Sequence, residues 1–196
     1  LQRLEAGMAN AIRLAGRLEI PNLVFGSPKQ RIIPAGMSPE KAIDRAVSVF
    51  SRIGDIAQSE GTKVAMEANP AVYGTNFLTD GEQALVFVRG VGHPAVRFVL
   101  DIGAMHINDV FEQTPKLIAE AGDLLSHVHF SEPQLTPAPA DAAAAATVLS
   151  ALDAARYDRA VSIEMKAVPD TPVEAMAAAA GRLDQARQIA IARGTT

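Results

Sequence analysis

Short apolar segments of strand length alternate along this chain with longer segments that have helical periodicity. The segments expected to form strands are residues 22–26, 63–67, 96–101, 125–130 and 160–165. Segments such as VRFVL lack the apolar–polar alternation of a half-exposed strand, so we expect both faces to be buried, as in a parallel sheet. The segments expected to form helices are residues 1–17, 38–59, 79–91, 109–121, 139–156 and 172–193. The pattern therefore predicts an α/β fold built from successive βα units.

Three helix starts have capping signatures, those at Ser38, Thr79 and Thr171. Ser38 precedes Pro39, so Ser38 can cap the helix while proline takes its first position. Thr79 and Glu82 have the spacing of a capping box for the helix that ends near Val91.

Four strands end on, or close to, residues that bind metals or move protons. These residues are Glu67 in KVAME, Asp101 in VRFVLD, His129 in SHVHF and Glu164 in AVSIE. Successive members are separated by about 30 residues, the length of one βα unit. Each therefore occupies an equivalent position, which predicts a parallel barrel with its site at the carboxyl ends of the strands.

A closed (β/α)8 barrel has eight strands, whereas this sequence predicts five. We therefore expect residues 1–196 to be a single domain that forms the C-terminal part of a TIM barrel, with about three strands preceding Leu1. A five-stranded doubly wound sheet is the structural alternative, although it would not bring four such strand ends to one point.

Three carboxylates and one imidazole are a suitable ligand set for one divalent metal ion. Oxygen-rich sets favour Mn²⁺, Mg²⁺ or Co²⁺, and Zn²⁺ is the alternative. Taken singly, each residue also has an ordinary explanation. Glu67 could be an exposed acid and Asp101 a helix cap. His129 could be a structural histidine, and Glu164 could pair with Lys166.

Further polar residues follow the strand ends and are candidates for substrate binding. They are Lys29, Arg31, Asn69, Tyr73, His127, Glu132 and Lys166. Lys29 and Arg31 suit a phosphate, a carboxylate or sugar hydroxyls, and the alternative is a solvated loop. His127 lies two residues before His129 and so points to the same side of the strand, where packing against the barrel wall is the alternative. His106 is expected in a surface loop.

Composition excludes several other classes of function. The net charge is −4 and no basic run is present, which argues against nucleic acid and against an anionic membrane surface. The absence of cysteine excludes disulfides, thiolate metal sites and cysteine nucleophiles. No apolar run approaches the roughly 20 residues of a membrane-spanning helix. We expect a cytoplasmic protein.

The segments FGSPKQR, AMEANPAVYGTNFLTD, VLDIGAMHIND, HVHFSEP and YDRAVSIEMK resemble the sugar phosphate isomerase/epimerase family. That family has a xylose-isomerase-like barrel and is related to endonuclease IV and to the ketose 3-epimerases. The resemblance implies that Glu67, Asp101, His129 and Glu164 hold the metal. It also implies that the first three strands are missing from this sequence.

Three positions depart from the substrate-binding set of the ketose 3-epimerases. Ala104 stands where those enzymes have a histidine, Tyr73 where they have a glutamate, and Leu135 where they have an arginine. The metal set is therefore retained while the ketose-binding set is not. A hydroxy-carbonyl substrate other than a free ketose is implied.

These observations predict a metal-dependent sugar or sugar-phosphate isomerase or epimerase, in which Glu67 and Glu164 transfer protons next to a carbonyl. The substrate would be a small sugar or sugar phosphate. Assembly of the protein into a homo-oligomer is a further possibility. Two alternatives remain. One is a metal-dependent hydrolase or lyase, endonuclease IV-like or a dehydratase, on the same barrel, and the other is a non-catalytic incomplete barrel.

Overall fold

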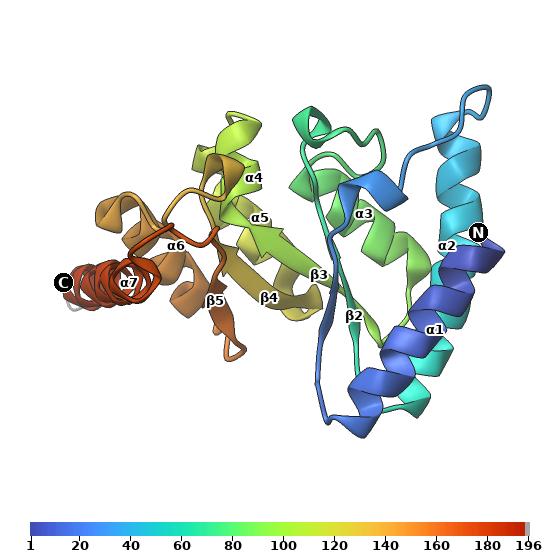
Figure 1. Ribbon diagram of the computed structural model, residues 1–196, viewed down its shortest axis with the longest axis horizontal. Helices are drawn as coiled ribbons and strands as arrows, with labels where there is room; N and C mark the ends of the chain where they lie inside the picture. Colours follow the sequence, from blue (N-terminus) through green and yellow to red (C-terminus); the bar gives the residue numbers. More distant parts are fainter. Residues whose placement is uncertain (195–196) are drawn as a thin grey trace. The chain divides into compact units, whose positions relative to one another are not determined.

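A computed structural model of the protein describes residues 1–194 (Figure 1). The chain divides into two compact units, Leu1–Val99 and Leu100–Thr196. Strand β3 (Val96–Asp101) begins in the first unit and ends in the second. No helix in the described part of the chain is long and apolar enough to cross a membrane.

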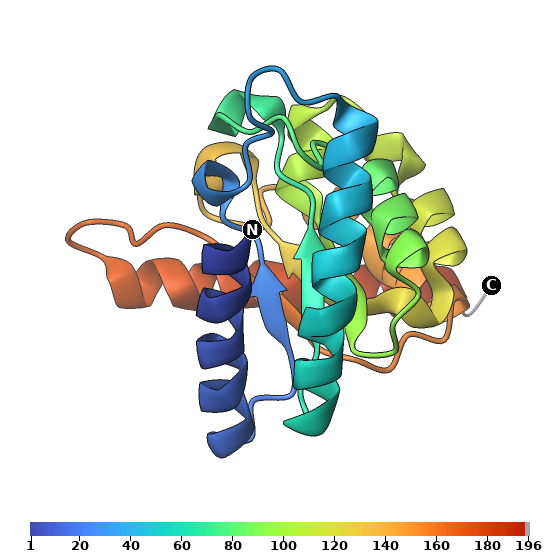
Figure 2. The same ribbon diagram turned by 90° about the vertical axis from the view of Figure 1, so that its right-hand side faces the viewer.

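The first unit consists of three parallel strands with helices packed beside them (Figures 1 and 2). Besides β3, its elements are α1 (Gln2–Arg17), β1 (Leu23–Phe25), the 3-10 helix η1 (Pro28–Gln30), α2 (Pro39–Ser59), β2 (Val64–Glu67), the 3-10 helix η2 (Ala71–Tyr73) and α3 (Gly81–Val91). Strand β2 pairs with β1 on one side and with β3 on the other, and Glu67 is in register with Val99. All four residues of β2 are buried, as expected for a central parallel strand.

Aromatic side chains fill the core of the first unit. The Phe50 ring lies edge-on to the rings of Phe25 and Phe87, with centroid distances of 5.1 and 5.5 Å. Phe77 continues the chain of rings at 5.6 Å from Phe87. Edge-to-face packing of this kind adds to the energy of apolar burial. The rings thus connect the end of β1 to α2 and α3.

The second unit continues from the end of β3. Its further elements are α4 (Ile102–Ile107), the 3-10 helix η3 (Phe111–Gln113), α5 (Thr114–Ala121), the 3-10 helix η4 (Gly122–Leu124), β4 (Leu125–Phe130), the 3-10 helix η5 (Pro133–Leu135), α6 (Ala142–Ala154), β5 (Val161–Ile163) and α7 (Pro172–Gly194). Strands β4 and β5 are parallel, with Val128 in register with Val161. Leu125, Val128 and Phe130 of β4 are fully buried. All five predicted strands are present, which confirms the α/β class.

The structure corrects the predicted start of α3. Asp80, not Thr79, is the N-cap, and its Oδ1 accepts a hydrogen bond from the Gln83 backbone N–H at 2.8 Å. The Gln83 side-chain oxygen in turn accepts from the Thr79 backbone N–H at 3.1 Å. The sequence contains two overlapping patterns with capping-box spacing, and the structure uses the later one.

Helix α4 was not predicted, and the helix expected over 109–121 begins only at Thr114. The short helix starts directly after β3 because Asp101 caps it. His106 therefore lies in a helix instead of a surface loop, and its ring stacks on Phe111 at 4.3 Å. Strand β1 is also less buried than expected, since Val24 is exposed.

Candidate metal centre

Three of the four predicted ligands lie together in the second unit. Asp101 is the last residue of β3, His129 is the last but one of β4, and Glu164 follows β5. Each offers a ligand atom, and these atoms lie within 4.8 Å of one another. Asp101 and His129 are largely buried, whereas the Glu164 side chain is nearly half exposed. The strand ends thus place two carboxylates and one imidazole around one point.

The His129 ring nitrogen Nδ1 faces both carboxylates. It lies 3.0 Å from Glu164 Oε2 and 3.9 Å from Asp101 Oδ2. The hydrogen bond with His129 holds the pKa of Glu164 below its ordinary value, against the opposing effect of burial. Glu164 therefore pairs with His129, which replaces the alternative of a pair with Lys166. An imidazole nitrogen between two carboxylates is a donor set that suits a divalent cation.

Both oxygens of Asp101 accept hydrogen bonds. Oδ1 accepts from the Ala104 backbone N–H at 2.6 Å, and Oδ2 accepts from the Ser131 hydroxyl at 2.6 Å. Asp101 is therefore a helix cap, as one alternative proposed. Capping does not exclude metal binding, because each carboxylate oxygen has a second lone pair.

Glu67 is the last residue of β2 in the first unit and is only 8% exposed. The alternative of an exposed acid is therefore wrong. Asn69 Nδ2 lies 3.5 Å from Glu67 Oε2, at the limit for a hydrogen bond. Gly26 lies against the same carboxylate, and a Cβ at position 26 would collide with Glu67 Oε2. Burying a carboxylate costs free energy unless other groups compensate for the lost water. The missing side chain of Gly26 leaves room for the Glu67 carboxylate, and Asn69 lies beside it.

Arg31 is the candidate substrate residue with the most unusual environment. It is 6% exposed, which excludes a solvated loop position for this residue. Its Nη1 donates to the Phe25 carbonyl at 3.4 Å, and its guanidinium lies 5.6 Å from the centroid of the Phe25 ring. Among the described residues, its buried Nε and Nη2 have no hydrogen-bond partner. Burial lowers the pKa of Arg31 to about 10, an effect that the negative charge of Glu67 opposes.

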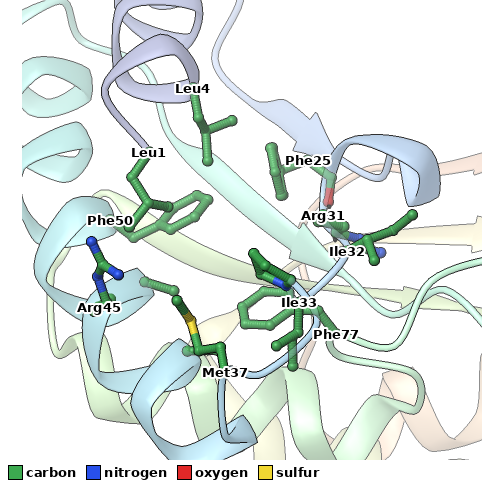
Figure 3. Close-up of a pocket in the computed structure, with 13 residues that line it drawn as sticks. Leu1, Leu4, Phe25, Arg31, Ile32, Ile33, Met37, Arg45, Phe50 and Phe77 are labelled. Carbon is green, nitrogen blue, oxygen red and sulfur yellow. Dashed lines mark hydrogen bonds between the residues drawn. The ribbon is translucent and has the colours of Figure 1, made fainter.

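Arg31 also contributes to the wall of a cavity of about 300 Å³ in the first unit (Figure 3). The rest of the wall is mainly apolar and includes Leu4, Phe25, Phe50 and Phe77. Such a lining does not supply the polar groups that a sugar requires. Arg31 and Arg45 are the charged side chains in this wall.

The other candidate substrate-binding residues of the first unit differ in how far their side chains are buried. Asn69 is buried beside Glu67, Tyr73 is half-buried in η2, and Lys29 is exposed.

His127 Nε2 lies 2.8 Å from Ser162 Oγ, and its ring is edge-on to that of His129 at 5.0 Å. Glu132 accepts a hydrogen bond from the Ala140 backbone N–H at 2.7 Å, so its carboxylate holds its own loop. Lys166 is exposed. The second unit therefore brings His127 to the three ligands, and Glu132 has one carboxylate oxygen in a hydrogen bond within its own loop.

Sequence reasoning missed Gly26, Ser131 and Ser162. Gly26 directly follows β1 and Ser131 directly follows β4, so both come after a strand end, as the candidate substrate-binding residues do. That position was the available signal. Their roles depend on contacts between segments that are far apart in the sequence.

Residues 2–186 match the model of a family described as a xylose isomerase-like TIM barrel. This match confirms the predicted TIM-barrel type of the fold, with five of its βα units in this chain. A comparison with curated proteins gives no match.

Several solved structures share the fold. A D-psicose 3-epimerase from Clostridium cellulolyticum H10 has a TM-score of 0.73 at 16% identity, over 96% of this chain and 70% of that chain. An L-ribulose 3-epimerase has a TM-score of 0.76 at 18% identity, over 95% and 69%. The 3-keto-D-glucoside 4-epimerase YcjR from E. coli has a TM-score of 0.76 at 15% identity, over 92% and 70%. At these identities the likeness shows the fold.

Proposed function

The chain belongs to the xylose isomerase-like TIM barrel family, and from this we propose that it is a divalent-metal-dependent isomerase or epimerase of a sugar or sugar phosphate. The observation that carries the proposal is the cluster of Asp101, His129 and Glu164 at the strand ends. The structures of similar fold include proteins named as sugar epimerases, which supports the reaction class.

We propose that Glu67 completes the metal set. It ends β2, which pairs in register with β3, the strand that ends on Asp101. In a parallel barrel the carboxyl ends of neighbouring strands face the same site, so equivalent positions converge. Three carboxylates and one imidazole favour Mn²⁺, Mg²⁺ or Co²⁺ over Zn²⁺.

In the proposed reaction, Glu67 and Glu164 transfer the protons. A bound divalent ion would supply Lewis acidity that makes the hydrogen next to the substrate carbonyl more acidic. One glutamate removes that proton from carbon, which leaves an enediolate. The other, in its protonated form, returns a proton to the opposite face of the same carbon, which inverts the centre. Return of the proton to the neighbouring carbon would instead exchange an aldose and a ketose.

Substrate binding is assigned to the loops after the strands. The proposed residues are Lys29, Arg31, Asn69, Tyr73, His127, Glu132 and Lys166. Arg31 is the strongest of them, because two of its buried donors have no partner among the described residues. A phosphate or carboxylate oxygen would satisfy such donors well. We therefore favour a sugar phosphate as the substrate. We also propose that the protein acts in the cytoplasm, as a monomer or as a homo-oligomer.

The test is turnover by the full chain with Mn²⁺ on a panel of ketoses, sugar phosphates and inososes. Exchange of the carbon-bound hydrogen in D₂O, followed by NMR, detects proton transfer on any of them. Glu164→Gln keeps the size of the side chain and removes its acid–base function. Loss of general acid–base catalysis is expected to slow exchange by about 10²–10⁴-fold.

Glu174→Gln is the matched control, because Glu174 is an exposed glutamate in the first turn of α7. It should retain full activity. Activity of Glu164→Gln equal to that of the wild type would overturn the assignment of this glutamate. Hydrolysis or elimination products in place of isomers would favour the hydrolase or lyase alternative.

A further inference from the structure

We propose that Ser131 is a positioning residue that fixes the Asp101 carboxylate for metal binding, an inference that rests on the proposed function. Ser131 directly follows β4 and is 2% exposed. Its Oγ lies 2.6 Å from Asp101 Oδ2 and 2.8 Å from the Gly103 backbone nitrogen. The buried Ser131 hydroxyl thus connects the segment that carries His129 to the segment that carries Asp101.

The direction of each hydrogen bond follows from the groups involved. The Gly103 backbone N–H can only donate, so Ser131 Oγ accepts there. An ionised carboxylate can only accept, so the Ser131 hydroxyl proton points at Asp101 Oδ2. The backbone N–H of Ala104 donates to the other oxygen, Oδ1. Asp101 is therefore held at both oxygens and cannot rotate freely.

Gly103 allows the close approach of Ser131. A Cβ at position 103 would lie 2.7 Å from Ser131 Oγ and 3.0 Å from the Glu132 carbonyl oxygen. Real Cβ atoms essentially never come as close as the first of these distances. Any other residue at position 103 would therefore displace the hydroxyl from Asp101.

The same hydrogen bond fixes the spacing of two proposed ligands. Ser131 lies two residues after His129 on the same segment, and Asp101 ends a different strand. Because Ser131 bonds to Asp101, the His129 segment and the Asp101 carboxylate are held at a set separation. Groups that orient metal ligands in this way typically contribute 10- to 100-fold to metal affinity.

The experiment measures Mn²⁺ affinity of the full chain by isothermal titration calorimetry, with the EPR spectrum of bound Mn²⁺ as a second readout. Ser131→Ala is expected to weaken Mn²⁺ binding by about 10- to 100-fold and to alter the spectrum. Ser126→Ala is the matched control, since Ser126 is another buried serine on β4. We expect Ser126→Ala to keep the wild-type affinity and spectrum, even if both variants lower the metal-free unfolding temperature.

Gly103→Ala provides a second variant, in case Ser131→Ala does not fold. It keeps the hydroxyl but pushes it from Asp101, so it should weaken Mn²⁺ binding in the same way. Wild-type affinity in Ser131→Ala, or in Gly103→Ala where only that variant folds, would overturn the positioning role and leave the proposed function intact. Absence of Mn²⁺ binding by the wild type would instead overturn the proposed function, and the role of Ser131 with it.

Discussion

Gly26 lies directly after β1, and the Glu67 carboxylate occupies the space where a side chain at position 26 would be. Gly26→Ala is therefore expected to displace Glu67 and to lower both turnover and Mn²⁺ affinity. Overpacking of a buried site typically costs about 1–3 kcal/mol of folding stability. Chemical denaturation and the D₂O exchange assay would measure the two effects.

Gly7→Ala is a control for this substitution. Gly7 lies within α1, and a Cβ there would meet no atom within 4 Å. Alanine in a helix is more stable than glycine by up to about 1 kcal/mol, so this variant should be neutral or more stable. Unchanged turnover in Gly26→Ala would show that catalysis does not require the Glu67 carboxylate to occupy the space beside Gly26.

At the scale of single elements, the N-cap of α3 has a stability that can be measured. Asp80 caps this helix, and Gln83 closes the reciprocal bond to Thr79. Asp80→Ala should lower the free energy of unfolding by about 1 kcal/mol, because one backbone donor loses its partner. Thr79→Ala keeps both backbone bonds and should lose much less. The opposite order in urea denaturation would contradict the observed cap.

The elements also show what the sequence could and could not predict. The five strands, and the four candidate ligands at or near their carboxyl ends, were predictable because apolar runs that end on polar residues repeat at the length of a βα unit. Helix α4 was not, because it has only six residues, too few for a helical pattern to be recognised, although Asp101 was considered as a helix cap. Ser131 was missed because its partners, Asp101 and Gly103, belong to another strand and helix. Local patterns find elements and repeated positions, whereas orienting contacts arise only when distant segments meet.

At the scale of the whole molecule, the proposed metal set takes residues from both compact units. Glu67 belongs to the first, and Asp101, His129 and Glu164 belong to the second. A ligand that binds only the folded protein stabilises it, by about 2.7 kcal/mol when present at 100 times its dissociation constant. We therefore expect Mn²⁺ to raise the unfolding temperature and EDTA to reverse the increase.

Glu67→Gln and Asp101→Asn separate the contributions of the two units to this effect. The measured quantity is the shift in unfolding temperature on adding Mn²⁺, which cancels any change that a substitution makes in the metal-free protein. Both variants should lose most of the shift, whereas the exposed control Glu174→Gln should keep it. A full Mn²⁺ shift in Glu67→Gln together with a lost shift in Asp101→Asn would place the metal site in the second unit alone. Glu67 would then retain only the role of a proton-transferring residue, which the D₂O exchange assay tests separately.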